Sequence, residues 1–466
     1  MINPVPMKRF IFLLMALMLP FTAFADDVVV RPGQKVGAIK PMNCMNNGPI
    51  EKQFYNYANG GYYKSAHIPF ARTHDTSESM SNGGEHTVDI SAIFPDFSKD
   101  VNDPASYDFK VTDSYLKSLL DAGTEVFYRL GQRIEWTVKK YNVVPPKDPE
   151  KWAGICEHII RHYNEGWADG FHWNIRYWEI WNEFDIGEPM WTGTNEAFYE
   201  LYETTALHLK KCFPDLKIGG PAVANPKNEA TAGFMKYAVA HKIPLDFFSW
   251  HIYTLDPKEM AKLSRYVRKM LDDYGYTDTE SILNEWNYMT FRSRYQDFAF
   301  PRMSTHVGAS FVMAAMQLMQ DEDCDMLMYY CANPGARYNG LVDRMTAEPT
   351  RTYYPFYAWD KLSVLGTQVK TDLSYSGDED EQGDLYATAA RGEDGRLAVV
   401  VTRFNDSSCK DWVKGIKIKV EGANYTEAVG HLTDNSHIYT EVPLTLKDNE
   451  LTVYLKTDSF IVVELR

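Results

Sequence analysis

The sequence predicts an α/β protein, a (β/α)8 TIM barrel with an additional C-terminal all-β sandwich domain. Short apolar stretches alternate with amphipathic helical stretches from about residue 36 to residue 366. The count of such β-α units reaches eight, which indicates a closed barrel of parallel strands. After Gly366 the pattern changes to short, β-branched stretches separated by turn residues, which is typical of an all-β domain.

The first 25 residues have the order of features of a secretory signal peptide. Lys8 and Arg9 precede an apolar stretch over residues 10–19, and Ala23-Phe24-Ala25 follows as a small-x-small cleavage signature. We expect cleavage after Ala25 and a secreted or periplasmic protein that is not held in a membrane afterwards. The alternative is a buried N-terminal helix.

The remaining chain divides into a barrel over residues 26–366 and a β domain over residues 367–466, with residues 28–30 as a candidate extra strand of the β domain. The expected barrel strands are residues 36–40, 66–72, 124–130, 175–180, 216–220, 245–250, 281–284 and 326–330. Amphipathic spacing predicts helices over residues 152–163, 195–212, 257–274 and 305–320. The last of these is apolar almost all round and should be well buried. An open doubly wound sheet is the alternative, but no GxGxxG motif supports it.

The composition excludes several partner classes. A net charge of −15 disfavours binding to nucleic acid and to anionic membranes. None of the six cysteines has CxxC spacing. Buried free thiols are the preferred interpretation, and pairing of some of them in an exported protein is the alternative. We expect no metal and no organic cofactor, and the oligomeric state stays open.

Two glutamates end predicted barrel strands in an unusual context. Glu183 follows the fourth strand in the run Trp-Asn-Glu, and Glu285 follows the seventh strand in the run Asn-Glu-Trp-Asn. Reacting groups of such barrels lie at the C-terminal ends of the strands. Hydrolysis of a glycosidic bond needs two carboxyl groups that flank the bond, one protonated and one ionised. The pair therefore predicts a glycosidase. Asn182 can donate to a sugar hydroxyl, and Trp286 can wall the pocket.

These motifs resemble clan A of the glycoside hydrolases, and within it family 39, which holds β-xylosidases and α-L-iduronidases. The matching stretches are residues 178–183, 220–222, 248–253 and 283–287. The resemblance implies a retaining enzyme that acts on plant or host polysaccharide or oligosaccharide fragments in two displacement steps. Glu183 matches the acid/base of the family and Glu285 matches the nucleophile.

The resemblance also implies substrate-binding roles. Asn182 matches a sugar-binding asparagine, His251 and Tyr253 match residues that contact the sugar ring, and His74 matches a histidine of the family. Tyr330 replaces a tryptophan at the floor of the sugar pocket.

Two further departures concern the neighbours of these residues: Phe184 stands in place of proline and Asp75 in place of glycine. We expect such departures to affect which sugar binds more than which reaction is catalysed.

Other interpretations remain for individual residues and for the whole chain. His251 and Tyr253 can instead be packing residues, and Glu179 is interpreted as an ion-pair partner. Arg72 and Arg129 are expected to pair with carboxylates inside the barrel, and Arg72 can help to keep Glu285 ionised. A catalytically inactive carbohydrate-binding protein is the alternative function. A metal-dependent barrel hydrolase is a third hypothesis.

Overall fold

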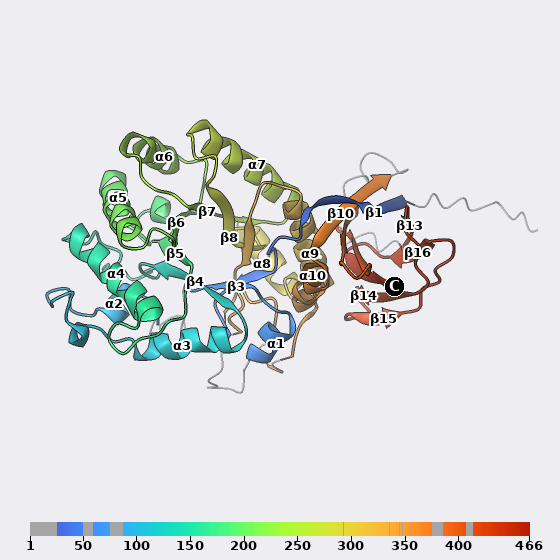
Figure 1. Cartoon of the computed structure of the whole chain (residues 1–466), viewed down its shortest axis with the longest axis horizontal. Coiled ribbons are helices and arrows are strands. Elements are labelled where there is room, and N and C mark those ends of the chain that lie inside the picture. The colour runs from blue at the N-terminus through green and yellow to red at the C-terminus, as the bar shows by residue number, and fades with distance from the viewer. Residues whose placement is uncertain are drawn as a thin grey trace, which may run out of the picture.

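The structure is a computed structural model that describes residues 26–49, 59–74, 87–291, 293–334, 336–343, 345–346, 348–374, 385–406 and 413–466. These residues form a closed eight-stranded barrel and a nine-stranded sheet that lie side by side (Figure 1). The predicted fold class is therefore confirmed. The expected signal peptide, Asp75 and Cys409 lie outside the described residues.

All neighbouring strands of the barrel are parallel, and the last strand pairs with the first. The strands are β2 (Cys44–Asn46), β3 (Phe70–Arg72), β4 (Glu125–Leu130), β5 (Tyr177–Ile180), β6 (Lys217–Val223), β7 (Phe247–Thr254), β8 (Glu280–Tyr288) and β9 (Met326–Tyr329). Large apolar side chains, among them Phe70, Phe127 and Phe247, fill the lower interior. Gly219 makes room for them, because a Cβ atom there would lie 2.3 Å from the Phe247 carbonyl oxygen. Because this apolar core fills the barrel near the amino ends of the strands, the polar side chains lie at the carboxyl ends.

The expectation for the first barrel strand was wrong. Residues 36–40 were expected to form it, but β2 (Cys44–Asn46) does so. Residues 36–38 instead end β1 (Asp26–Ala38), which pairs with β10 (Thr367–Ser374) of the second sheet. The physical reason is burial: a barrel strand is covered on both faces, as all three residues of β2 are, whereas Val36 is 56% exposed.

Ten helices lie among the described residues: α1 (Gly60–Ser65), α2 (Ile90–Ile93), α3 (Lys110–Asp121), α4 (Pro149–Glu165), α5 (Asn195–Cys212), α6 (Glu229–His241), α7 (Pro257–Asp273), α8 (Ser293–Arg302), α9 (His306–Gln320) and α10 (Tyr354–Leu365). The four predicted helices correspond to α4, α5, α7 and α9. Side chains of Asp148, Thr194 and Asp256 cap α4, α5 and α7 by accepting hydrogen bonds from backbone N–H groups of the first turn. None of the helices in these described segments is both long enough and apolar enough to cross a membrane.

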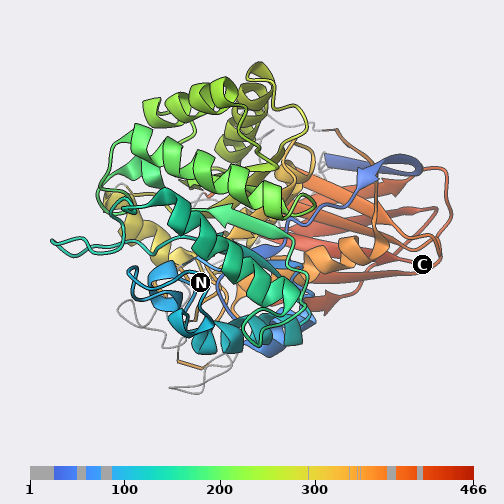
Figure 2. The same cartoon turned by 60° about the vertical axis from the view of Figure 1, so that its left-hand side comes forward.

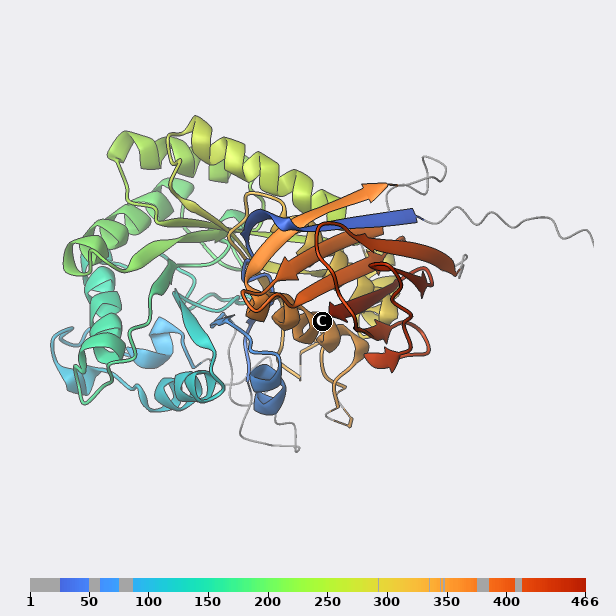
Figure 3. The same cartoon turned by 45° about the vertical axis from the view of Figure 1, so that its right-hand side comes forward.

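The second sheet has the strand order β15-β14-β17-β12-β11-β10-β1-β13-β16. Its remaining strands are β11 (Leu385–Arg391), β12 (Leu397–Arg403), β13 (Lys414–Val420), β14 (Ala428–Thr433), β15 (Thr440–Val442), β16 (Glu450–Leu455) and β17 (Ser459–Leu465). Side chains from strands far apart in this order, such as Ile418 of β13 and Val463 of β17, share one core. The sheet therefore folds over itself as a sandwich (Figure 3).

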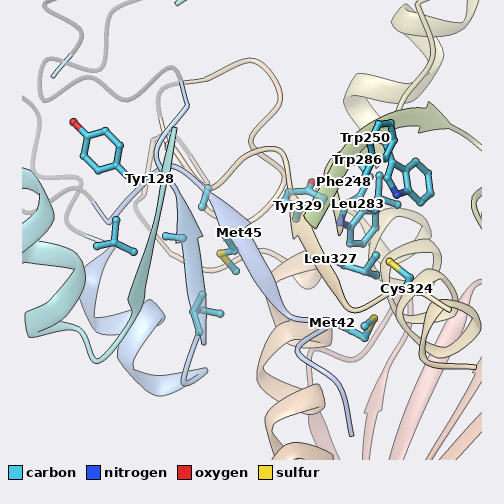
Figure 4. Close-up of a cluster of buried hydrophobic side chains, with 14 of the residues drawn as sticks. Met42, Met45, Tyr128, Phe248, Trp250, Leu283, Trp286, Cys324, Leu327 and Tyr329 are labelled. Carbon is cyan, nitrogen blue, oxygen red and sulfur yellow. The ribbon is translucent and has the colours of Figure 1, made fainter. Parts of the chain in front are cut away.

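Helix α9 lies between the barrel and the second sheet (Figure 1), and nearly all of its residues are buried. Gln317 Nε2 donates to the Val400 carbonyl at 2.9 Å, and Gln320 Nε2 donates to the Ala38 carbonyl at 2.9 Å. Burial on two sides explains why this helix is apolar almost all round, as the sequence predicted. Figure 4 shows part of the core between the barrel and the helices around it. The side chains of Trp250, Leu283 and Trp286 lie there, on the outer face of strands β7 and β8.

Candidate active site at the carboxyl end of the barrel

Glu183 is placed by an unusual backbone path after β5. Trp181 and Glu183 have φ angles of +71° and +45°, which are uncommon for residues with a side chain. Two backbone hydrogen bonds hold this path: Trp181 N donates to Leu130 O at 2.7 Å, and Glu183 N donates to Ala222 O at 2.9 Å. The chain thereby turns at the end of the strand, and Glu183 lies at the barrel mouth with its side chain 15% exposed.

Glu285 is placed by a bulge in β8. Trp250 and His251 are consecutive in β7, but their partners in β8 are Leu283 and Glu285, so Asn284 is an extra residue. Side chains normally alternate between the two faces of a strand, and a bulge changes this alternation. Asn284 donates to Glu179 inside the barrel, and Glu285 also faces inward. The bulge therefore lets two consecutive side chains point into the interior.

The two glutamates meet at one histidine. His251 Nδ1 lies 2.8 Å from Glu183 Oε1 and 3.6 Å from Glu285 Oε2. One carboxylate oxygen of Glu183, one of Glu285 and a ring nitrogen of His251 all lie within 4.8 Å of one another. Burial lowers the pKa of His251, which favours a neutral imidazole. Residues that are 102 positions apart in the chain thus share one polar cluster.

The environment of Glu285 stabilises its anion against a strong effect of burial. Arg72 Nη1 donates to Glu285 Oε1 at 2.7 Å, and the Tyr253 hydroxyl donates to Glu285 Oε2 at 2.8 Å. Burial raises the pKa of Glu285 above the ordinary value of 4.5, and the negative charge of Glu183 raises it further, while Arg72 and Tyr253 oppose the rise. Both oxygens of Glu285 therefore accept a hydrogen bond from a nearby side chain.

Comparison with known proteins agrees with this geometry. The model of glycosyl hydrolases family 39 matches residues 67–289, a segment that contains both glutamates. A β-xylosidase from Caldicellulosiruptor saccharolyticus is 32% identical over 353 residues, which are 68% of this chain and 68% of that protein. This chain belongs to glycoside hydrolase family 39.

Two further likenesses extend the comparison. A β-xylosidase from Geobacillus stearothermophilus is 28% identical over 218 residues, and this match spans only 40% of the length of that enzyme. The crystal structure of a glucosidase from Croceicoccus marinus has a TM-score of 0.77 at 22% identity and covers 95% of this chain and 99% of its own. A family 39 β-xylosidase from Caulobacter crescentus has a TM-score of 0.66 at 14% identity, covering 94% of this chain and 99% of its own. The structural neighbours share the fold over both parts of the family 39 chain.

Arg72 is the centre of the buried polar network in this family 39 chain. Besides Glu285, its guanidinium group donates to Glu179 Oε2 at 2.6 Å and to Asn182 Oδ1 at 2.6 Å. The interpretation of Glu179 as an ion-pair partner is thus confirmed, and so is the pairing of Arg72 with carboxylates. Arg129 also pairs as expected, with Asp89 at 2.7 Å.

Most of the predicted substrate-binding residues lie around the cluster. His251 belongs to the cluster, Asn182 is buried next to Glu183 in the chain, and His74 Nε2 lies 3.9 Å from Glu285 Oε1. The ring of Tyr330 is 6.4 Å from that of Tyr253. The structure therefore brings these residues together, and their roles toward a substrate stay predictions.

Trp286 is placed elsewhere, so the prediction that it walls the pocket needs correction. Its side chain is fully buried and packs against Phe311 of α9 and against Tyr329. Figure 4 labels Trp286 and Tyr329 in this core. Because Glu285 faces the interior, the next residue along β8 faces the surrounding helices. Phe184 also packs away from the carboxylates, stacked on Phe198 with ring centres 3.9 Å apart.

Sequence reasoning missed part of the aromatic rim. Phe291 is 64% exposed, and its ring centre lies 5.1 Å from that of Tyr253. Tyr338 lies 6.4 Å from Tyr253 and 5.7 Å from Tyr330 between ring centres. The aromatic composition of residues 289–302 was a signal for Phe291, whereas no motif pointed to Tyr338.

The cluster of Glu183, His251 and Glu285 also has donor atoms that a metal ion could use. Each oxygen of Glu285 already accepts a hydrogen bond, one from Arg72 Nη1 at 2.7 Å and one from the Tyr253 hydroxyl at 2.8 Å. The arrangement of donors around Glu285 suits a carboxylate that reacts as an anion better than one that binds a metal.

Proposed function

We propose that this family 39 chain is a retaining, β-xylosidase-like glycosidase in which Glu285 is the nucleophile and Glu183 is the acid/base. The observation that carries the proposal is the short gap between the two carboxylates, whose nearest oxygens lie within 4.8 Å. Retaining glycosidases hold their carboxyl groups about 5–5.5 Å apart, whereas inverting enzymes leave about 6.5–9.5 Å for a water molecule. The gap supports direct attack by one carboxylate on the sugar.

The hydrogen bonds and the exposure of the two side chains support the proposed division of roles. A nucleophile must be ionised, and Glu285 receives hydrogen bonds from the Arg72 guanidinium group and the Tyr253 hydroxyl. Glu183 is the more exposed of the two, with a side chain that is 15% exposed against 6% for Glu285. A position nearer to solvent suits a group that gives a proton to the departing alcohol and later takes one from water.

The reaction proceeds in two displacements. A Glu285 oxygen bonds to the anomeric carbon while the glycosidic C–O bond breaks, and Glu183 gives its proton to the leaving oxygen. In the ester that forms, Glu285 no longer carries a negative charge. The repulsion that opposed ionisation of Glu183 is therefore gone. Glu183 then takes a proton from water, whose oxygen attacks the anomeric carbon and releases the Glu285 carboxylate.

Several groups support a sugar as the substrate. The Asn182 Nδ2 group is buried and has no hydrogen-bond partner within the described segments, so it is available to a sugar hydroxyl. Tyr253, Tyr330 and Phe291 offer aromatic faces beside the carboxylates. Two relatives are named β-xylosidases, which makes plant or host polysaccharide and oligosaccharide fragments the proposed source of substrate.

A screen of nitrophenyl glycosides tests the proposal. It includes β-xyloside and α-arabinosides, followed by NMR of the first product anomer. We expect hydrolysis with retention. Glu285→Ala should abolish turnover, and Glu183→Ala should regain rate on an activated aryl glycoside when azide is added. Glu203→Ala, on the outer helices, is the control. Inversion, or full activity in Glu285→Ala, would refute the mechanism; sugar binding without hydrolysis would favour a binding protein.

A further inference from the structure

A second cluster of possible metal ligands lies on helices outside the barrel. His208 and Cys212 are one helical turn apart on α5, and Glu157 lies on α4. The two helices lie side by side around the barrel (Figures 1 and 2). One donor atom of each residue lies within 4.8 Å of the other two. We propose that Glu157, His208 and Cys212 form a zinc-binding site that joins α4 to α5.

The distances are close to those of a metal site. His208 Nε2 lies 2.6 Å from Glu157 Oε2 and 3.9 Å from Cys212 Sγ. Zinc binds imidazole nitrogen and carboxylate oxygen at about 2.0–2.2 Å and thiolate sulfur at about 2.3 Å, so tetrahedral ligands are about 3.3–3.8 Å apart. Zinc binding would therefore separate the Glu157 and His208 donors by about 0.7 Å, while the 3.9 Å distance between the His208 and Cys212 donors already lies near the upper end of that range.

The neighbouring charges orient the carboxylate. Arg161 Nε donates to Glu157 Oε1 at 2.7 Å, which leaves Oε2 facing His208. Such second contacts commonly fix the ligands of metal sites. Arg161 also forms an ion pair with Glu165, so its positive charge is partly balanced there. Burial raises the pKa of Cys212, and because zinc binds the thiolate, binding releases a proton and strengthens as pH rises.

The three side chains are exposed enough for an ion in solution to reach them. The His208 side chain is 35% exposed and that of Glu157 is 16% exposed. Cys212 is partly exposed, whereas the other four cysteines in the described parts of the chain are buried. A zinc ion here would link the helices before and after β5, the strand that leads to Glu183.

The chain contains a matched control for this cluster. His241 of α6 pairs with Glu203 of α5 at 3.0 Å, with side chains that are 42% and 23% exposed. The pair also joins neighbouring helices, but no cysteine of the described residues completes it as a ligand set. His241→Ala therefore removes a similar contact without removing a proposed ligand.

The test is calorimetric titration of the full chain with zinc chloride alone, after treatment with chelator and thiol reductant. We expect one site whose affinity falls at least about tenfold in His208→Ala and in Cys212→Ser, since each loses one ligand, but not in His241→Ala. Zinc should also slow alkylation of Cys212, measured by peptide mass spectrometry. It should raise the Tm of the wild type and of His241→Ala, but not that of His208→Ala or Cys212→Ser.

Two results would overturn the proposal. One is wild-type protein that binds no zinc or binds it equally well after His208→Ala. The other is a site that disappears in Glu285→Gln instead, which would place the ion at the carboxylate cluster. Hydrolysis by Cys212→Ser should equal that of the wild type, because none of the three ligands belongs to the active site.

Discussion

The hydroxyl group of Tyr253 donates a 2.8 Å hydrogen bond to Oε2 of Glu285. The bond joins β7 to β8 at the point where the bulge turns Glu285 inward. A hydrogen bond to a charged group is worth about 1.5–3 kcal/mol, enough to affect both the ionisation and the reactivity of the carboxylate.

Tyr253→Phe should therefore lower kcat/KM by about 10- to 100-fold, because a loss of 1.36 kcal/mol is a factor of ten in rate. The acid limb of the pH profile should move upward, since the variant loses a bond that favours the anion. Steady-state kinetics on an aryl glycoside measures both. Tyr237→Phe is the control, because Tyr237 bonds to Glu203 on the outer helices at 2.7 Å. An unchanged pH profile would contradict the assigned role.

The pH dependence follows from the burial of Glu285. Burial raises its pKa above 4.5, and a protonated carboxyl cannot attack, so the rate should fall as pH drops through that raised pKa. We expect an acid limb of kcat/KM above pH 4.5. In Glu183→Ala the basic limb should disappear, because that limb reports the loss of the proton that Glu183 gives to the leaving group. A dinitrophenyl glycoside, whose departure needs little acid catalysis, allows the measurement. A basic limb that persists in Glu183→Ala would contradict the role of Glu183 as the acid.

Arg72 should be as important for stability as for chemistry. Arg72→Met leaves Glu179 fully buried without its partner, which costs about 3–5 kcal/mol of unfolding free energy. The double variant Arg72→Met/Glu179→Met should recover part of this loss, because the pair is removed together. Urea denaturation of the single and double variants measures the coupling. Strictly additive losses would argue against a shared network.

Trp286 should affect stability and leave substrate binding unchanged. Trp286→Ala opens a cavity between β8 and α9 and should lower the free energy of unfolding by about 3–5 kcal/mol. KM on an aryl glycoside, measured well below the Tm of the variant, should stay at the wild-type value. A large rise in KM without loss of stability would instead support the prediction that Trp286 lines the sugar pocket.

The proposed signal peptide gives one prediction about the N-terminus. Cleavage after Ala25 would leave Asp26 as the first residue, which is also the first residue of β1. Mass spectrometry of protein secreted with its native leader should therefore find a chain that begins at Asp26. Cleavage several residues later would remove part of the strand that joins β10 to β13 and would contradict this expectation.

Local patterns were enough to predict much of this protein. The period of the apolar residues predicted α4, α5, α7 and α9, and alternation with short apolar stretches predicted the barrel. The runs around Glu183 and Glu285 pointed to the two carboxylates because strand ends carry the chemistry of such barrels. These features depend on residues that are near one another in the chain, so they can be read from the sequence alone.

Tertiary structure decided what depends on distant contacts. Whether residues 36–38 joined the barrel or the second sheet was decided by pairing with the distant strand β10, which leaves Val36 exposed. The inward direction of Glu285 and the outward direction of Trp286 follow from a one-residue bulge, which period-two patterns do not reveal. Similarly, Glu157 and His208 are 51 positions apart and meet only because α4 packs on α5. The sequence determined the elements and the reacting residue types, while packing determined which faces met.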